Sequence, residues 1–246
     1  MLAAAFWALI GSGALIVGAA LGFWLDVSRK TLGLIMGFGA GTLLSAISFD
    51  LVLEAFQESP GLPVVVGLLA GAMAFWVGDL LIERMQDKKA ANGGEDDAGA
   101  DDEEGSGLQL ALGATLDGVP ESVAIGLTLL GGNPVSAAIV LAVFLSNGPE
   151  GRAASVELAR TGYSRAKIMG IWIGVVALCV VAAALGFVLL GDAHPQTVAV
   201  INSFAAGSIL AMLSITMMPQ AFAKGGRAVG LATVLGFILA AGLSAH

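Results

Sequence analysis

Residues 38–56, FGAGTLLSAISFDLVLEAF, recur without a gap as residues 204–222, FAAGSILAMLSITMMPQAF. The match keeps a phenylalanine at both ends and identical alanine, glycine, leucine and serine positions between them. A shorter motif upstream, AALGF at 19–23, recurs at 183–187. Each long copy is mostly apolar and close to the roughly 20 residues that a helix needs to cross a bilayer. The repeat therefore predicts two related membrane-spanning helices, one in each half of the chain.

The composition of the whole chain also indicates a membrane protein. Of its 246 residues, 57% are hydrophobic and 12% are charged, which leaves too few polar groups to cover a water-soluble surface. The apolar runs predict an all-α integral membrane protein with eight transmembrane helices. These are expected at residues 6–25, 31–56, 62–82, 108–130, 135–158, 168–190, 198–221 and 230–243.

The basic residues fall in alternate connections between these runs. Short cytoplasmic connections retain Lys and Arg, so the pattern predicts both termini outside the cytoplasm and an even number of spans. It also supports the count of eight, because a missed span would break the alternation. The residues concerned are Arg29, Lys30, Arg84, Lys88, Lys89, Arg160, Arg165, Lys167, Lys224 and Arg227.

The repeat relates helices one to three to helices six to eight. Because the offset is five spans, the second set is expected to cross the membrane in the opposite direction. Inverted repeats are common in secondary transporters, whose substrate sites lie near the midplane at the repeat interface. Helices four and five remain between the two sets.

Helices four and five carry related polar motifs, DGVPES at 117–122 and SNGPEG at 146–151. In a helix, the first residue of each motif shares a face with the glutamate four positions later. Each proline frees the carbonyl four residues before it, that of Leu116 or Leu145. A bare carbonyl in lipid is tolerated only against protein, water or an ion. The two motifs therefore predict a set of hard oxygen ligands for a cation.

A second polar pair lies on the repeated helix two. Asp50 and Glu54 are four residues apart, and the aligned positions of helix seven hold Thr216 and Gln220. An aspartate at the centre of a membrane helix costs roughly 2.5 to 3.5 kcal/mol on insertion scales, so such residues are usually functional. We expect Asp50, Glu54 and Gln220 to line an asymmetric transport pathway.

The acidic residues are concentrated between helices three and four. Residues 86–107 contain eight Asp and Glu residues among Gly and Ala, which predicts a flexible, solvated cytoplasmic loop. A segment that attracts cations or regulates the protein is the alternative. The single cysteine, Cys179, lies within a helix and is expected to serve packing.

Together these features resemble the ZIP (Zrt/Irt-like) family of divalent metal transporters. The resemblance rests on the Pro-Glu pairs of helices four and five, the eight spans with both ends outside, and the variable loop after helix three. It implies a 3+2+3 helix arrangement in a bacterial inner (plasma) membrane. It also implies a binuclear metal site between helices four and five that moves zinc, iron or similar ions into the cytoplasm.

The chain departs from the family at the metal-site histidines. The family has histidine where this chain has Asp117 and Ser146, and asparagine where it has Gly118. The two histidines present, His194 and His246, lie outside the predicted helices and are expected to be solvated. The ligand set carried over from the family is Asp117, Glu121 and Glu150, assisted by Ser146 and Asn147.

The loss of imidazole changes the expected ion. Zinc favours nitrogen and sulfur ligands, whereas carboxylate, carbonyl and water suit magnesium or manganese. We therefore give manganese, magnesium and ferrous iron more weight than the family name suggests, while zinc remains an alternative with Asp117, Glu121 and Glu150 as its ligands. The ion would be the transported substrate, and no cofactor is expected.

Arg152 follows the second motif and allows two interpretations. The first is an ion pair with Glu157 or with an acidic residue of another helix. The second is that its guanidinium, which cannot lose its charge, replaces a bound cation beside Glu121 or Glu150.

Three functional hypotheses follow from the sequence. The first is a divalent metal carrier in the lipid bilayer, the second a carrier of another cation or solute with proton coupling, and the third a non-transporting membrane protein with a degenerate site. No catalytic or phosphate-binding motif is present, so neither an enzyme nor a nucleic-acid partner is predicted. Glycine stripes at 33/37/41 and 67/71 are expected to pack helices within one bundle, with a homodimer face as the alternative.

Overall fold

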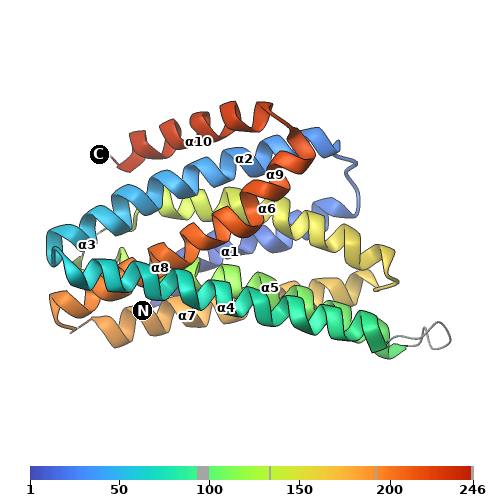
Figure 1. The fold of residues 1–246 in the computed structure, drawn as a ribbon, viewed down its shortest axis with the longest axis horizontal. Coiled ribbons are helices and arrows are strands. Elements are labelled where there is room, and N and C mark those ends of the chain that lie inside the picture. Colours follow the sequence, from blue (N-terminus) through green and yellow to red (C-terminus); the bar gives the residue numbers. More distant parts are fainter. Residues whose placement is uncertain (93–99, 133, 192, 245–246) are drawn as a thin grey trace.

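The computed structural model describes residues 1–92, 100–132, 134–191 and 193–244, and all regular structure within these ranges is helical (Figure 1). Six spans are single helices: α1 (Leu2–Gly22), α4 (Leu62–Asn92), α5 (Ala100–Leu127), α6 (Ala137–Arg160), α7 (Arg165–Leu190) and α10 (Ala228–Ser244). The second span comprises α2 (Arg29–Ala46), the π-helix η1 (Ile47–Val52) and α3 (Leu53–Glu58). The seventh comprises α8 (Pro195–Met212), the π-helix η3 (Leu213–Met217) and α9 (Met218–Gly225).

The hydropathy of these helices confirms an all-α integral membrane protein. Five spans are long and apolar enough to cross a bilayer, namely those formed by α1, α2 to α3, α4, α7 and α8 to α9, and α10 is a shorter apolar helix. The fourth and fifth spans, α5 and α6, each contain a proline inside the helix, Pro120 and Pro149. The most polar spans are therefore the two that carry the related motifs.

Helical structure extends into the segment predicted as a loop. Helix α4 continues to Asn92 and α5 begins at Ala100, so parts of residues 86–107 are helical, while 93–99 and His246 lie outside the described residues. Hydropathy marks only the part of a helix that lies in hydrocarbon. The residues beyond it include Gln, Lys, Ala and Glu, which are good helix formers in water.

The two composite spans share an irregularity that the repeat alignment places in register. In the alignment of residues 38–56 with 204–222, η1 and η3 begin at equivalent positions. The Ser48 hydroxyl donates to the carbonyl of Leu44 at 2.7 Å, and the aligned Ser214 hydroxyl donates to the aligned Leu210 carbonyl at 2.9 Å. Such bonds to the carbonyl four residues earlier bend helices, and π-turns mark functional segments. The inverted repeat is therefore a structural repeat as well as a sequence repeat.

Aligned glycines fix how the two repeats pack. Gly41 of α2 lies against the carbonyl oxygen of Thr233 in α10, and the aligned Gly207 of α8 lies against the carbonyl oxygen of Leu68 in α4. A Cβ at either position would overlap that oxygen. Span two thus packs on span eight as span seven packs on span three. The glycine stripes serve contacts within the bundle, as predicted.

The basic connections gather at one end of the bundle, which we call the basic end. It holds the turns between α1 and α2, α6 and α7, and α9 and α10 (right in Figure 1). Both described termini and the α3–α4 turn lie toward the other end, which we call the opposite end. Helices α1, α5, α6 and α7 pack on one another, as do α2 with α10 and α4 with α8, and contacts of α2 with α6 and α5 with α8 join these groups.

Candidate functional site

A cavity of about 380 Å³ lies among the spans that carry the polar motifs. Four carboxylates line it, and they come from three helices: α4, α5 and α6. The rest of the wall is formed by two hydroxyl side chains, one amide side chain and several apolar side chains, three of which are methionines. The polar lining residues are Asp79, Asp117, Glu121, Ser146, Glu150, Thr216 and Gln220, and the methionines are Met36, Met212 and Met217.

Both predicted pairs of motif residues reach this cavity. Asp117 and Glu121 of α5 line it together, as do Ser146 and Glu150 of α6. The four-residue spacing places each pair on one helical face, as the sequence predicted. The two motifs therefore converge on one volume even though α5 and α6 run antiparallel.

Glu121 is the most deeply buried of the four carboxylates. Its side chain is 1% exposed, and its Oε1 accepts a hydrogen bond of 3.4 Å from the hydroxyl of Ser146. Its Oε2 has no hydrogen-bond partner among the described residues. A buried carboxylate with one unsatisfied oxygen is costly unless a cation, a proton or water satisfies it. This oxygen, on a residue that lines the cavity, is the strongest sign of a bound ligand.

The cavity extends from the motifs toward the basic end. Beyond Glu121 and Ser146 in that direction its wall includes Gly113, Ala153 and Ile82, which lie on the basic-end halves of α5, α6 and α4. Gln220 of α9 lies on the same side, where its Oε1 accepts a hydrogen bond of 3.2 Å from Lys224. The predicted pathway residue Gln220 therefore does share the cavity with the motif carboxylates.

Asp50 and Glu54 lie elsewhere. They lie in the half of span two that is nearer the opposite end, and neither residue lines the cavity. The Ser136 hydroxyl donates to Asp50 Oδ2 at 2.5 Å, and the same hydroxyl accepts the Ile139 N–H as the N-cap of α6. Asp50 and Glu54 therefore do not share the cavity with Gln220, because the inverted repeat places their aligned positions toward opposite ends of the bundle.

Asn147 does not line the cavity, although its side chain also interacts with that of Glu121. Its amide donates to the carbonyl of Gly11 in α1 at 3.4 Å, and it is 1% exposed. The carbonyl of Leu145, freed by Pro149, approaches Gly39 of α2, and Leu145 is not part of the cavity wall. Of the expected oxygen ligands, these two thus serve contacts between helices.

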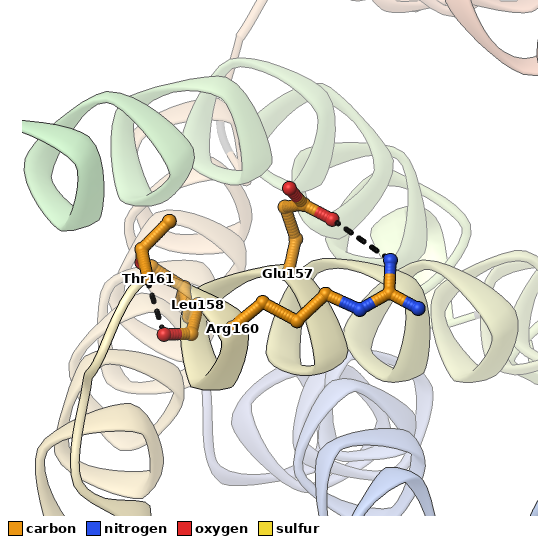
Figure 2. Close-up of polar contacts among 4 residues, drawn as sticks. All are labelled: Glu157, Leu158, Arg160 and Thr161. Atoms are coloured by element: carbon orange, nitrogen blue, oxygen red, sulfur yellow. Dashed lines mark hydrogen bonds and ion pairs between the residues drawn. The ribbon is translucent and has the colours of Figure 1, made fainter.

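Among the residues that the structure describes, Arg152 takes neither of its two predicted positions. Its Nη2 donates to the carbonyl of Leu25, just beyond α1, at 2.8 Å, and Arg152 does not line the cavity. Glu157 lies 3.6 Å from Arg160 instead, one turn along α6 (Figure 2). Gly18 and Gly22 of α1 bring that helix close to the Arg152 backbone and side chain, so the guanidinium reaches the unpaired carbonyl at the end of α1.

The environment of Gly118 explains one departure from the family pattern. A Cβ there would lie 2.9 Å from the Sγ of Cys179, which is fully buried on α7. The thiol occupies the space that a side chain on α5 would need. Cys179 therefore packs, as expected, while the exposed His194 precedes α8 far from the cavity wall.

Sequence reasoning gave less weight to Asp79 and did not single out the three methionines. The span predicted at 62–82 ends three residues after Asp79, whereas α4 continues to Asn92 and so places Asp79 well inside the helix. In the part of the chain that the structure describes, no group of three or more His, Cys, Asp or Glu side chains is arranged so that it could hold a metal ion. The carboxylates surround a space instead of converging on a point.

Comparison with known proteins gives one relative and no family model. No protein-family model matches the chain. The chain is 31% identical over 209 residues to a putative zinc transporter from Arabidopsis thaliana, a match that covers 84% of this chain. It spans about a third (32%) of the length of that relative. The match supports the resemblance read from the two Pro-Glu motifs.

Proposed function

We propose, from the premise that this chain is a ZIP-family membrane protein, that it carries divalent metal ions across a bilayer through the cavity between α5 and α6. The observation that carries the proposal is the unsatisfied Oε2 of Glu121 in a cavity that Asp79, Asp117 and Glu150 also line. Four carboxylates around one small volume repel one another unless cations neutralise them. A divalent ion is the substrate that offsets this repulsion most effectively.

The width of the cavity bears on the kind of ion. A volume of about 380 Å³ has room for several water molecules beside an ion. Carboxylates that are spread around such a space can bind an ion that keeps part of its water shell, which Mg²⁺ does readily and Mn²⁺ tolerates. Zinc prefers four converging nitrogen or sulfur ligands. We therefore place manganese, magnesium and ferrous iron before zinc as substrates.

The two ends of the bundle suggest the direction in which the cavity is accessible. We place the basic end in the cytoplasm of a bacterium, with the chain in the inner membrane and both termini outside. The cavity then extends toward the cytoplasm, and the bond between Asp50 and Ser136 lies on the outer side. A rocking motion of the inverted repeats would alternate between a cavity accessible from the cytoplasm and a cavity accessible from outside.

Metal uptake into proteoliposomes tests the proposal. The native chain should take up Mn²⁺, and Glu121→Gln or Glu150→Gln should slow uptake roughly tenfold or more, because about 1.4 kcal/mol of lost ion binding already gives that factor. Glu157→Gln is the matched control, since Glu157 lies on the same helix but pairs with the exposed Arg160. Equal uptake by the native chain and the Glu121 variant would reject the proposal.

Proton-coupled movement of another cation is the second candidate. It is favoured by the same buried carboxylates, which can exchange protons as well as metals, and by the absence of a converging ligand group among the described side chains. Acid-driven flux that needs no divalent metal and is lost in Glu121→Gln would select it. A site closed by Arg152 is the less favoured hypothesis, because that guanidinium binds the Leu25 carbonyl and Arg152 does not line the cavity.

A further inference from the structure

A second pocket, of about 420 Å³, lies on the side of the bundle between α5 and α7, away from the carboxylate cavity. Its lining is almost wholly apolar and includes the exposed Leu112 and Leu178. At its basic-end margin it is lined by Lys167 and Tyr163. We refer to it as the lateral groove. No residue of the groove lines the carboxylate cavity.

The groove owes its depth to α7. Gly170 and Gly174 lie one turn apart along its wall, and a Cβ at either would meet no atom of the described residues within 4 Å. Gly41 and Gly207 differ in this respect, because a carbonyl oxygen of a neighbouring helix occupies the space where their Cβ would lie. The bundle therefore leaves the space beside these two glycines open.

The groove combines this open apolar channel with a positive charge at one end. The Lys167 ammonium lies 4.6 Å from the centroid of the Tyr163 ring, which fixes it at the mouth of the groove. The Lys167 N–H bonds to Ser164, the N-cap of α7, so the ammonium also lies beside a helix N-terminus, where negative charge is favoured. Gly170 and Gly174 continue along α7 from this charge into the span.

We propose that the lateral groove binds an anionic phospholipid of the leaflet at the basic end, with one acyl chain along Gly170 and Gly174 and the phosphate at Lys167. The two parts of such a lipid match the two parts of the groove: the acyl chain matches the apolar channel, and the anionic headgroup matches the Lys167 ammonium. Basic pockets between membrane helices bind anionic headgroups in this way. The proposal does not depend on which ion, if any, the cavity transports.

The chain offers a matched control at the start of α10. Arg227 and Gly230 repeat the spacing of Lys167 and Gly170, a basic residue three positions before a glycine with open surroundings. Neither lines the lateral groove, so the pair has the charge and the small residue without the channel. Variants of this pair therefore distinguish lipid binding in the groove from a general attraction of basic residues to anionic lipid.

The test is native mass spectrometry of the full chain titrated with dioleoylphosphatidylglycerol or dioleoylphosphatidylcholine. We expect tighter retention of the anionic lipid, about fivefold weaker retention in Lys167→Gln from the loss of one basic contact of about 1 kcal/mol, and loss of the bound lipid in Gly170→Leu. Arg227→Gln and Gly230→Leu should retain it as the native chain does.

Three results would overturn the proposal. They are equal retention of the two lipids by the native chain, an equal loss in the α10 variants, and unchanged retention in Gly170→Leu. A dimer that Gly170→Leu converts to monomers would assign the groove to a second copy of the chain instead, and would equally overturn it. Circular dichroism and gel filtration of each variant establish that a loss of lipid is not a loss of folding.

Discussion

The two copies of the repeat have the same backbone and different chemistry. Both contain a π-helix in the same register, and both place a serine hydroxyl on the carbonyl four residues earlier. In the first copy the aligned polar positions are Asp50 and Glu54, whereas in the second they are Thr216 and Gln220. An inverted repeat puts these equivalent positions at opposite ends of the bundle, so one sequence feature can serve the two sides of a transport path separately.

The contacts at the two positions show the difference. Asp50 accepts a hydrogen bond from Ser136 and so joins span two to the start of α6. The Thr216 hydroxyl donates within its own helix, to the carbonyl of Met212 at 2.8 Å, and both residues line the cavity. Toward the opposite end the aligned position thus forms a polar link between two spans, whereas toward the basic end it borders the cavity. The backbone repeat sets the geometry, and the side chains decide which contacts each copy makes.

The largest effect should come from breaking the packing that the copies share. Gly41→Val and Gly207→Val should each destabilise the fold by several kcal/mol, about 1–3 for overpacking and more where a backbone must move, because a Cβ at either site overlaps a carbonyl oxygen. The two losses should be similar. Thermal unfolding in detergent measures them, and Gly230→Val, in open surroundings, is the control. A large loss at one site only would show that the repeats do not pack equivalently.

A smaller effect should follow from breaking the link at the opposite end. Asp50→Ala leaves the partly buried Ser136 hydroxyl without its acceptor, which costs about 0.5–1.5 kcal/mol for a typical hydrogen bond. Hydrogen exchange at the first turn of α6 should rise, while exchange at the other end of α6 stays unchanged. Asp50→Asn retains an acceptor oxygen and should preserve most of the protection. Uniformly faster exchange along α6 would contradict a local link.

A carboxylate can be introduced into the second copy of the repeat at the position where the first copy has Glu54. Gln220→Glu restores at the aligned position the carboxylate that Glu54 supplies, on a residue that lines the cavity. We expect a divalent ion to bind several-fold more tightly, since a single partly screened charge contributes about 1 kcal/mol. Isothermal titration measures this, with Gln220→Asn as the neutral control. Weaker binding would show that Lys224 pairs with the new carboxylate and withholds it.

The smallest effect is expected at His194. It is exposed, precedes α8 and makes no side-chain cap. His194→Ala should change stability by less than about 0.5 kcal/mol and leave ion binding unaltered. A change in metal affinity would assign this histidine the ligand role that its position argues against.

The sequence predicted the spans and the shared face of each motif because both depend on local periodicity. The four-residue spacing of Asp117 and Glu121, and of Ser146 and Glu150, fixes their side in any helix, and all four line the cavity. It could not predict where Asn147 and Arg152 point, because that depends on how closely α1 approaches α6, which the small residues of α1 determine. Asp79 was underestimated because hydropathy ended its helix ten residues before the backbone does.

The most direct test of the central claim is a titration of the purified chain with Mn²⁺, read by thermal unfolding. A ligand of the native fold stabilises it in proportion to its occupancy, by about 2.7 kcal/mol at a hundred times Kd. We predict a saturable rise in Tm for the native chain and for Glu157→Gln, and a midpoint at least about tenfold higher in Glu121→Gln. The same midpoint in Glu121→Gln as in the native chain would contradict the account.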